Sequence, residues 1–180
     1  FRGITAPTFF TISGLIFTYL MLKAKEKGLE KQRMQKGIIR GFFLIFVGYI
    51  IRVPILQWLF GSFNTYFLVI DVLQCIGLSL ICIIILYFLS AKKTLIFSLI
   101  TVFIGICIFL TEPLYRDLNF ENIPLIFRNY ISKSKGSIFT IIPWFGYMAF
   151  GAFLATIFYK NLDKRYFKTI TVGSFMLIGT

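Results

Sequence analysis

The residues in this sequence that could do chemistry are the few polar ones that interrupt long apolar runs. Asp71 and Gln74 are three residues apart, so on a helix they would share one face. If that face met an aqueous pocket, it could bind a hydroxyl or amine substrate. If it met another helix, the two side chains would only supply interhelical hydrogen bonds. The two residues by themselves leave both interpretations open.

Arg52 is a second charge inside an apolar run. A charged side chain near the middle of a membrane helix costs at least about 2.5–3.5 kcal/mol, so each calls for a partner or a function. We expect Arg52 and Asp71 to form an ion pair between neighbouring helices. Arg52 lies further from the connecting turn than Asp71 does, and Pro54 would reduce this mismatch by ending the earlier helix.

Other polar groups are expected at a similar depth. Thr8 lies in the first apolar run, and Trp144 and Tyr147 lie near the start of the fifth. Pro143 predicts a kink there that frees a backbone carbonyl. The two aromatic residues are also compatible with the ordinary belt at a membrane interface. The shared depth of all these groups favours an outward-facing polar cavity.

The elements that would position these side chains are five apolar runs of about twenty residues, the length that spans a bilayer core. They lie at about Gly3–Leu22, Gly37–Phe60, Phe67–Leu89, Leu95–Thr111 and Ile138–Tyr159. With 58% hydrophobic residues, the composition agrees. We therefore predict an all-α, polytopic transmembrane helix bundle of about five complete helices. Thr169–Thr180 would begin a truncated sixth.

Residues 1–180 are predicted to form one transmembrane domain that is a fragment, with at least one helix missing at each end. The chain opens on Phe1 and leads directly into an apolar run. The final run at Thr169–Thr180 is too short to span. Glu112–Ser137 is the one long stretch expected outside the membrane.

Basic residues are concentrated in three loops, which hold thirteen of the nineteen Lys and Arg residues and most of the net charge of +12. These loops are Lys23–Arg40, Ser90–Thr94 and Lys160–Lys168. If every run spans once, they share one side, which the positive-inside rule makes cytoplasmic. The charge then sets orientation and contacts anionic lipid headgroups of the bilayer. Nucleic-acid binding is not expected.

Residues that could hold a metal are scarce. The sequence has no histidine, no clustered carboxylates and no CxxC pair, so no metal site is expected. Cys75, Cys82 and Cys107 are interpreted as buried free thiols within helices. Small residues at Gly37 and Gly41 predict close helix packing, and Gly151 with Ala155 predicts the same.

Three segments carry a family resemblance: Thr5–Gly14, Asp71–Leu78 and Pro143–Gly151. In this order and at these separations they resemble motifs of heparan-alpha-glucosaminide N-acetyltransferase-like membrane acyltransferases, especially bacterial members. The resemblance covers most of the chain. It implies a multi-pass protein of the bacterial cytoplasmic membrane, with the basic loops in the cytoplasm.

The resemblance also implies a reaction: transfer of an acetyl or other acyl group from cytosolic acyl-CoA to a sugar or glycan on the outer face. Acyl-CoA would be a co-substrate, with no permanently bound cofactor. Asp71 would be the catalytic carboxylate that orients a base, while Gln74, Thr8, Trp144 and Tyr147 would bind substrate. These are roles in general-base and oxyanion chemistry.

The sequence departs from the family pattern in two respects. The family's key histidine lies just upstream of the first motif, in a region that would precede Phe1, so this fragment alone is expected to be inactive. Cys75 stands where an arginine is common in the family.

An upstream histidine would favour the enzyme over the alternatives, which are a transporter or flippase with a polar cavity and no chemistry, or a structural subunit. A homo-oligomer is also left open.

Overall fold

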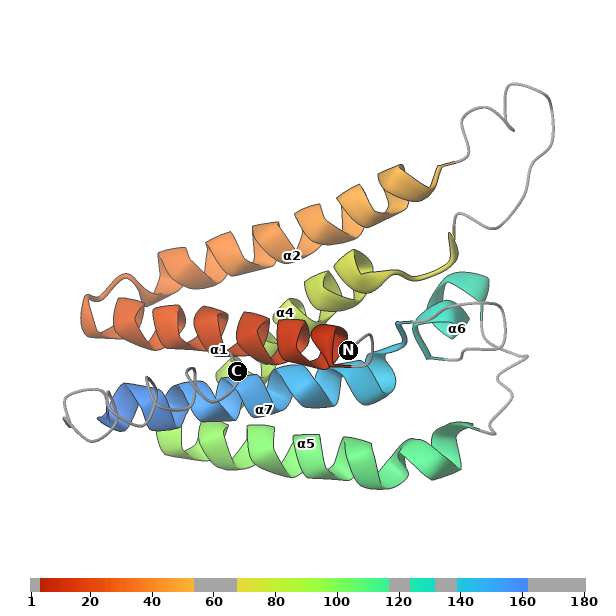
Figure 1. The fold of residues 1–180 in the computed structure, drawn as a ribbon. Coiled ribbons are helices and arrows are strands. Elements are labelled where there is room, and N and C mark those ends of the chain that lie inside the picture. Colours follow the sequence, from red (N-terminus) through yellow and green to blue (C-terminus); the bar gives the residue numbers. More distant parts are fainter. Residues whose placement is uncertain (1–3, 54–67, 117–123, 132–138, 162–180) are drawn as a thin grey trace, which may run out of the picture.

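The computed structural model describes residues 4–53, 68–116, 124–131 and 139–161, and within these ranges every regular element is a helix (Figure 1). The helices are α1 (Thr5–Glu26), α2 (Glu30–Arg52), α4 (Val72–Leu89), α5 (Thr94–Arg116), α6 (Leu125–Ile131) and α7 (Ile141–Asn161). Five of them are long and apolar enough to cross a membrane. The predicted all-α transmembrane bundle is thus confirmed. The expected sixth run and the turn at 61–66 lie outside the described residues.

The helices pack in two sets that share a core (Figure 1). Helix α7 lies between α1 and α5, while α2 packs along α4. Helix α4 also contacts α1 and α7 and so joins the two sets. Its hydropathy is the highest of the five spans, and half of it is buried, whereas only 17% of the α5 span is buried. The apolar residues exposed on α2 and α5, such as Phe43, Phe46 and Phe103, are those expected to face lipid.

Glycines allow the helix backbones to touch at two crossings. A side chain at Gly14 would collide with the carbonyl oxygen of Met148, and one at Gly151 would collide with that of Thr11. These contacts join α1 to α7. Gly41 and Gly77 meet in the same way between α2 and α4. The packing role predicted for Gly41 and Gly151 is confirmed by these contacts, and small residues let membrane helices approach closely in this way.

We call one end of the bundle the basic end. It holds the C-terminal ends of α1, α4 and α7 and the N-terminal ends of α2 and α5 (Figure 1). Here Lys25 donates a hydrogen bond to the backbone oxygen of Lys92, and the Lys92 amine lies 3.5 Å from Glu30 Oε1. Tyr159 donates to Glu26 Oε1 at 2.6 Å. The described parts of the three basic loops therefore gather at one end of the bundle, while residues 162–168 lie outside the described ranges.

Several helix boundaries differ from the prediction. Helix α2 begins at Glu30, seven residues before the apolar run, because its first turns consist of good helix formers despite their polarity. It ends at Arg52 instead of Phe60, since Val53 is extended (ψ 117°) before Pro54. Helix α4 begins at Val72 instead of Phe67.

The segment predicted to lie outside the membrane, Glu112–Ser137, is partly helical. Helix α5 continues through Pro113 to Arg116, and α6 follows. The cysteines also differ in part from expectation: Cys75 is fully buried, whereas Cys82 and Cys107 are only half-buried, and all three are free.

Candidate functional site

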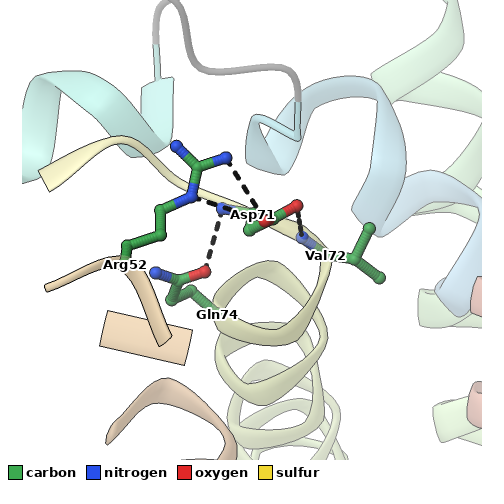
Figure 2. A network of polar contacts seen from close by, with 4 residues as sticks. All are labelled: Arg52, Asp71, Val72 and Gln74. Carbon is green, nitrogen blue, oxygen red and sulfur yellow. Dashed lines mark hydrogen bonds and ion pairs between the residues drawn. The ribbon is translucent and has the colours of Figure 1, made fainter. Parts of the chain in front are cut away.

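A polar network forms where α2 ends and α4 begins (Figure 2), at the end of the bundle opposite the basic end (Figure 1). We call this the Asp71 end. Arg52 is the last residue of α2, and Asp71 is the residue immediately before α4. The predicted run Phe67–Leu89 places Asp71 about one turn inside its helix, and this is wrong: Asp71 has extended backbone angles and caps the helix. The depth mismatch between Arg52 and Asp71 therefore disappears.

Asp71 and Gln74 together form a capping box at the start of α4. Asp71 Oδ1 accepts a hydrogen bond from the backbone N–H of Val72 at 2.9 Å, and Gln74 Oε1 accepts one from the N–H of Asp71 at 2.9 Å (Figure 2). A capping box satisfies backbone donors that a helix start leaves without partners. The spacing that was interpreted as a shared helix face thus has a local structural role.

The expected ion pair is present. Arg52 Nη2 lies 3.2 Å and Nε 3.4 Å from Asp71 Oδ2. These are longer than the usual 2.7–2.9 Å of charge-assisted hydrogen bonds. The Asp71 side chain keeps 40% of its surface exposed and that of Arg52 24%. The Asp71 carboxylate is therefore held by Arg52 yet stays partly exposed to the surroundings of the protein.

Gln74 is fully buried, and Gly48 of α2 makes room for it. A Cβ on Gly48 would lie 2.6 Å from Gln74 Cδ. The hydrogen bond from Asp71 N–H requires Oε1 at that position, so Nε2 points away, and it is buried without a hydrogen-bond partner. A buried amide donor without a partner is uncommon in folded proteins and calls for an explanation.

The candidate residues of α7 lie in an aromatic cluster. Trp144 contacts the rings of Phe10 and Phe139, with centroids 5.4 and 4.9 Å away, and it also lies 5.9 Å from Tyr147. The predicted break at Pro143 is present, because Ile142 has non-helical angles. At the break, the Ile142 carbonyl accepts a hydrogen bond from the Thr140 hydroxyl.

Thr140 links the aromatic cluster to α4. Its backbone oxygen accepts a hydrogen bond from the Cys75 thiol at 3.6 Å. Cys75 directly follows Gln74 in the sequence. Thr8, in contrast, is exposed on the first turns of α1, and its hydroxyl donates to the Ile4 carbonyl at 2.8 Å. The structure therefore brings Arg52, Asp71 and Gln74 together, and pairs Trp144 with Tyr147.

Helix α6 contacts the Asp71 end through residues that were not predicted to belong to the site. Asn129 donates to the Leu68 backbone oxygen at 2.8 Å, and the hydroxyls of Tyr130 and Tyr49 lie 3.5 Å apart. Burial, with this contact, raises the pKa of Tyr130 above its ordinary value. No sequence motif marks these residues, whose proximity depends on tertiary packing.

No group of side chains within the described ranges could hold a metal ion.

The fold and this site define a class: a multi-pass helical membrane protein with a polar network at the end opposite its basic loops. The model of the family described as "Heparan-alpha-glucosaminide N-acetyltransferase, catalytic" matches residues 1–179. The chain belongs to this family of transmembrane acetyltransferases. No curated protein and no solved structure matches it.

Proposed function

We propose that this protein transfers an acetyl group across the bacterial cytoplasmic membrane, from acetyl-CoA in the cytosol to a hydroxyl or amine of a sugar or glycan outside. Membership of the family supports the reaction. The observation that carries the site is the Gln74 amide, whose buried Nε2 lacks a hydrogen-bond partner, in the same capping box as the partly exposed Asp71 carboxylate. An amide donor and a carboxylate acceptor together suit recognition of a hydroxyl or amine.

In this proposal Asp71 is a positioning residue. Its two oxygens already accept hydrogen bonds from Val72 and Arg52, which suits holding a neighbouring group in place. The family resemblance implies a histidine as the base, and the 180 residues of this sequence contain none. Gln74 Nε2 would donate to the acceptor or to the oxyanion of the transition state, a kind of contact that commonly changes rates by 10²–10³-fold.

The aromatic cluster would form the rim of the acceptor site. Trp144 and Tyr147 offer apolar ring faces with polar tips, which suit a sugar at a membrane interface. Thr8 would lie at the outer edge of this rim on α1. The basic end would face the cytosol under the positive-inside rule, where its lysines would attract the phosphates of acetyl-CoA.

The test measures acetyl transfer by membranes that carry the longest natural chain containing this sequence, supplied with radiolabelled acetyl-CoA and a mixture of glycan acceptors. We expect Asp71→Asn and Gln74→Ala to lower kcat by about 10²-fold. The matched control is Gln35→Ala, which removes an exposed amide of α2. It should transfer at the parental rate.

Two results would contradict the proposal. If Asp71→Asn and Gln74→Ala insert, fold and transfer acetyl at the parental rate, the site assignment is wrong. If the intact protein transfers no acyl group but moves a solute across the membrane, the transporter interpretation is correct.

A further inference from the structure

A groove of about 550 Å³ runs between α1, α2 and α4. One part of it reaches Val72 and Leu73, which stand between Asp71 and Gln74 in the sequence, and it extends from there toward the basic end. Its volume is that of a typical ligand site. Most of its surface is apolar. Its lining includes Phe9, Ile12 and Ile16 from α1, Leu44 from α2, and Ile76 and Leu80 from α4.

Two arginines of α2, Arg33 and Arg40, also line this groove. They are seven residues apart and so lie on one face of the helix, about 10 Å apart along its axis. Neither has an acidic partner in the part of the chain that the structure describes. There, Asp71 pairs with Arg52, Glu30 pairs with Lys92, and Glu26 bonds Tyr159.

Arg33 carries the clearest sign of a missing ligand. Its Nε is buried and has no hydrogen-bond partner. Unsatisfied buried groups of this kind are uncommon and costly, more so when they are charged. An anion at this position would satisfy the guanidinium, which binds phosphate oxygens in a fork.

The apolar wall of the groove is open to its surroundings. Phe9, Ile12 and Ile16 are each about half exposed, at 56%, 47% and 50%, and they lie on a candidate membrane span. At this depth the surroundings are lipid chains, which can fill an apolar hollow without the cost of placing water there. The groove is therefore apolar along α1 and α4 and cationic along the first half of α2.

We propose that the groove binds an anionic phospholipid of the bilayer. Its phosphate would lie on the guanidinium groups of Arg33 and Arg40, and one acyl chain would lie along Ile12, Ile16 and Leu80. Basic pockets between membrane helices on the cytoplasmic side are typical sites for anionic headgroups. Arg33 is in the first turn of α2, near the basic end, which is where the headgroups of one leaflet would lie. This inference does not rest on the acetyl-transfer proposal.

The test uses the full-length protein, purified in a neutral detergent and given equal amounts of phosphatidylglycerol and phosphatidylcholine with identical chains. Native mass spectrometry then measures which lipid stays bound, without acetyl-CoA. We expect phosphatidylglycerol to be retained about tenfold over phosphatidylcholine. Arg33→Gln with Arg40→Gln should remove this preference.

The matched control is Lys31→Gln with Lys36→Gln, which removes the same charge from exposed positions of α2 that do not line the groove. It should keep the preference. Ser13→Trp narrows the apolar part and leaves both arginines, so it should also lower retention of phosphatidylglycerol. Unfolding temperatures and elution volumes show whether each variant is folded.

Three outcomes would overturn the proposal. Equal loss of lipid in the lysine control would mean that the attraction is non-specific. In a second sample to which acetyl-CoA is added, displacement of phosphatidylglycerol would assign the groove to the acyl donor. No retained phosphatidylglycerol in the folded parent protein would mean that the groove does not bind this class of lipid.

Discussion

At the Asp71 end of the bundle, Arg52 lies 3.2 Å from a carboxylate, whereas toward the basic end Arg33 and Arg40 have no acidic partner among the described residues. The two regions also differ in how they are built. Asp71 and Gln74 are tied into a capping box, while the arginines line an open apolar groove. The comparison indicates that an arginine of a membrane protein can be held by a carboxylate of the same chain or can be left to bind an external anion.

The strongest test of this comparison is topological, because its outcome is all or none. Lys27→Cys and Lys92→Cys should be labelled by an impermeant maleimide from one face, since both are exposed at the basic end. Pro124→Cys, exposed beside α6, should be labelled from the other. The background replaces Cys75, Cys82 and Cys107 by alanine. Labelling of Lys27→Cys and Lys92→Cys from opposite faces would contradict the arrangement.

Gly48→Ala should give the next largest effect. The added methyl group would lie 2.6 Å from Gln74 Cδ, and overpacking of this kind costs about 1–3 kcal/mol. Gly105→Ala is the matched control, since its nearest contact is 3.2 Å to the Phe150 ring and it should cost less. Unfolding in detergent measures both. Gln74→Ala combined with Gly48→Ala should recover part of the loss, and simple additivity would argue against the contact.

Asp71→Ala should lower the free energy of unfolding by about 1–2 kcal/mol, the usual cost of losing an N-cap. Asp71→Asn keeps a good capping side chain and loses only the charge on the Arg52 partner. It should cost less than about 1 kcal/mol, because the pair is partly exposed. If asparagine proved as harmful as alanine, the ion pair and not the cap would hold this end together.

Lys92→Ala should have the smallest effect, below about 1 kcal/mol, because its pair with Glu30 is 3.5 Å long and the lysine side chain is 45% exposed. The hydrogen bond from Lys25 goes to the backbone oxygen of residue 92 and survives the change. Added salt should abolish the difference between variant and parent. An effect as large as that of Asp71→Ala would mean that the two ends are equally constrained.

The membrane spans could be predicted from the sequence because every backbone polar group in a bilayer must be satisfied internally, which requires long helices. Their ends could not be read from hydropathy. Residues 68–70 are as apolar as the helix that follows but precede its start. The true start was marked by Asp71 and Gln74, whose spacing is that of a capping box. The end of α2 was marked by Pro54.

Much of the candidate site depends on contacts between helices, which no local pattern encodes. The pairing of Arg52 with Asp71 could be predicted from the cost of isolated charges at depth. The burial of Gln74 against Gly48 could not, because it depends on how α2 and α4 cross. The groove beside Arg33 was missed for the same reason, since its walls come from three helices.

We propose that the two ends bind different substrates, acetyl-CoA at the basic end and the acceptor at the Asp71 end. Sealed vesicles with the full-length protein in one orientation, fixed by the labelling pattern, test this directly. With acetyl-CoA only on the face labelled at Lys27→Cys, we predict acetylation of a membrane-impermeant acceptor on the opposite face, reduced about 10²-fold by Gln74→Ala. Acetylation only of an acceptor on the same face as acetyl-CoA would contradict the account.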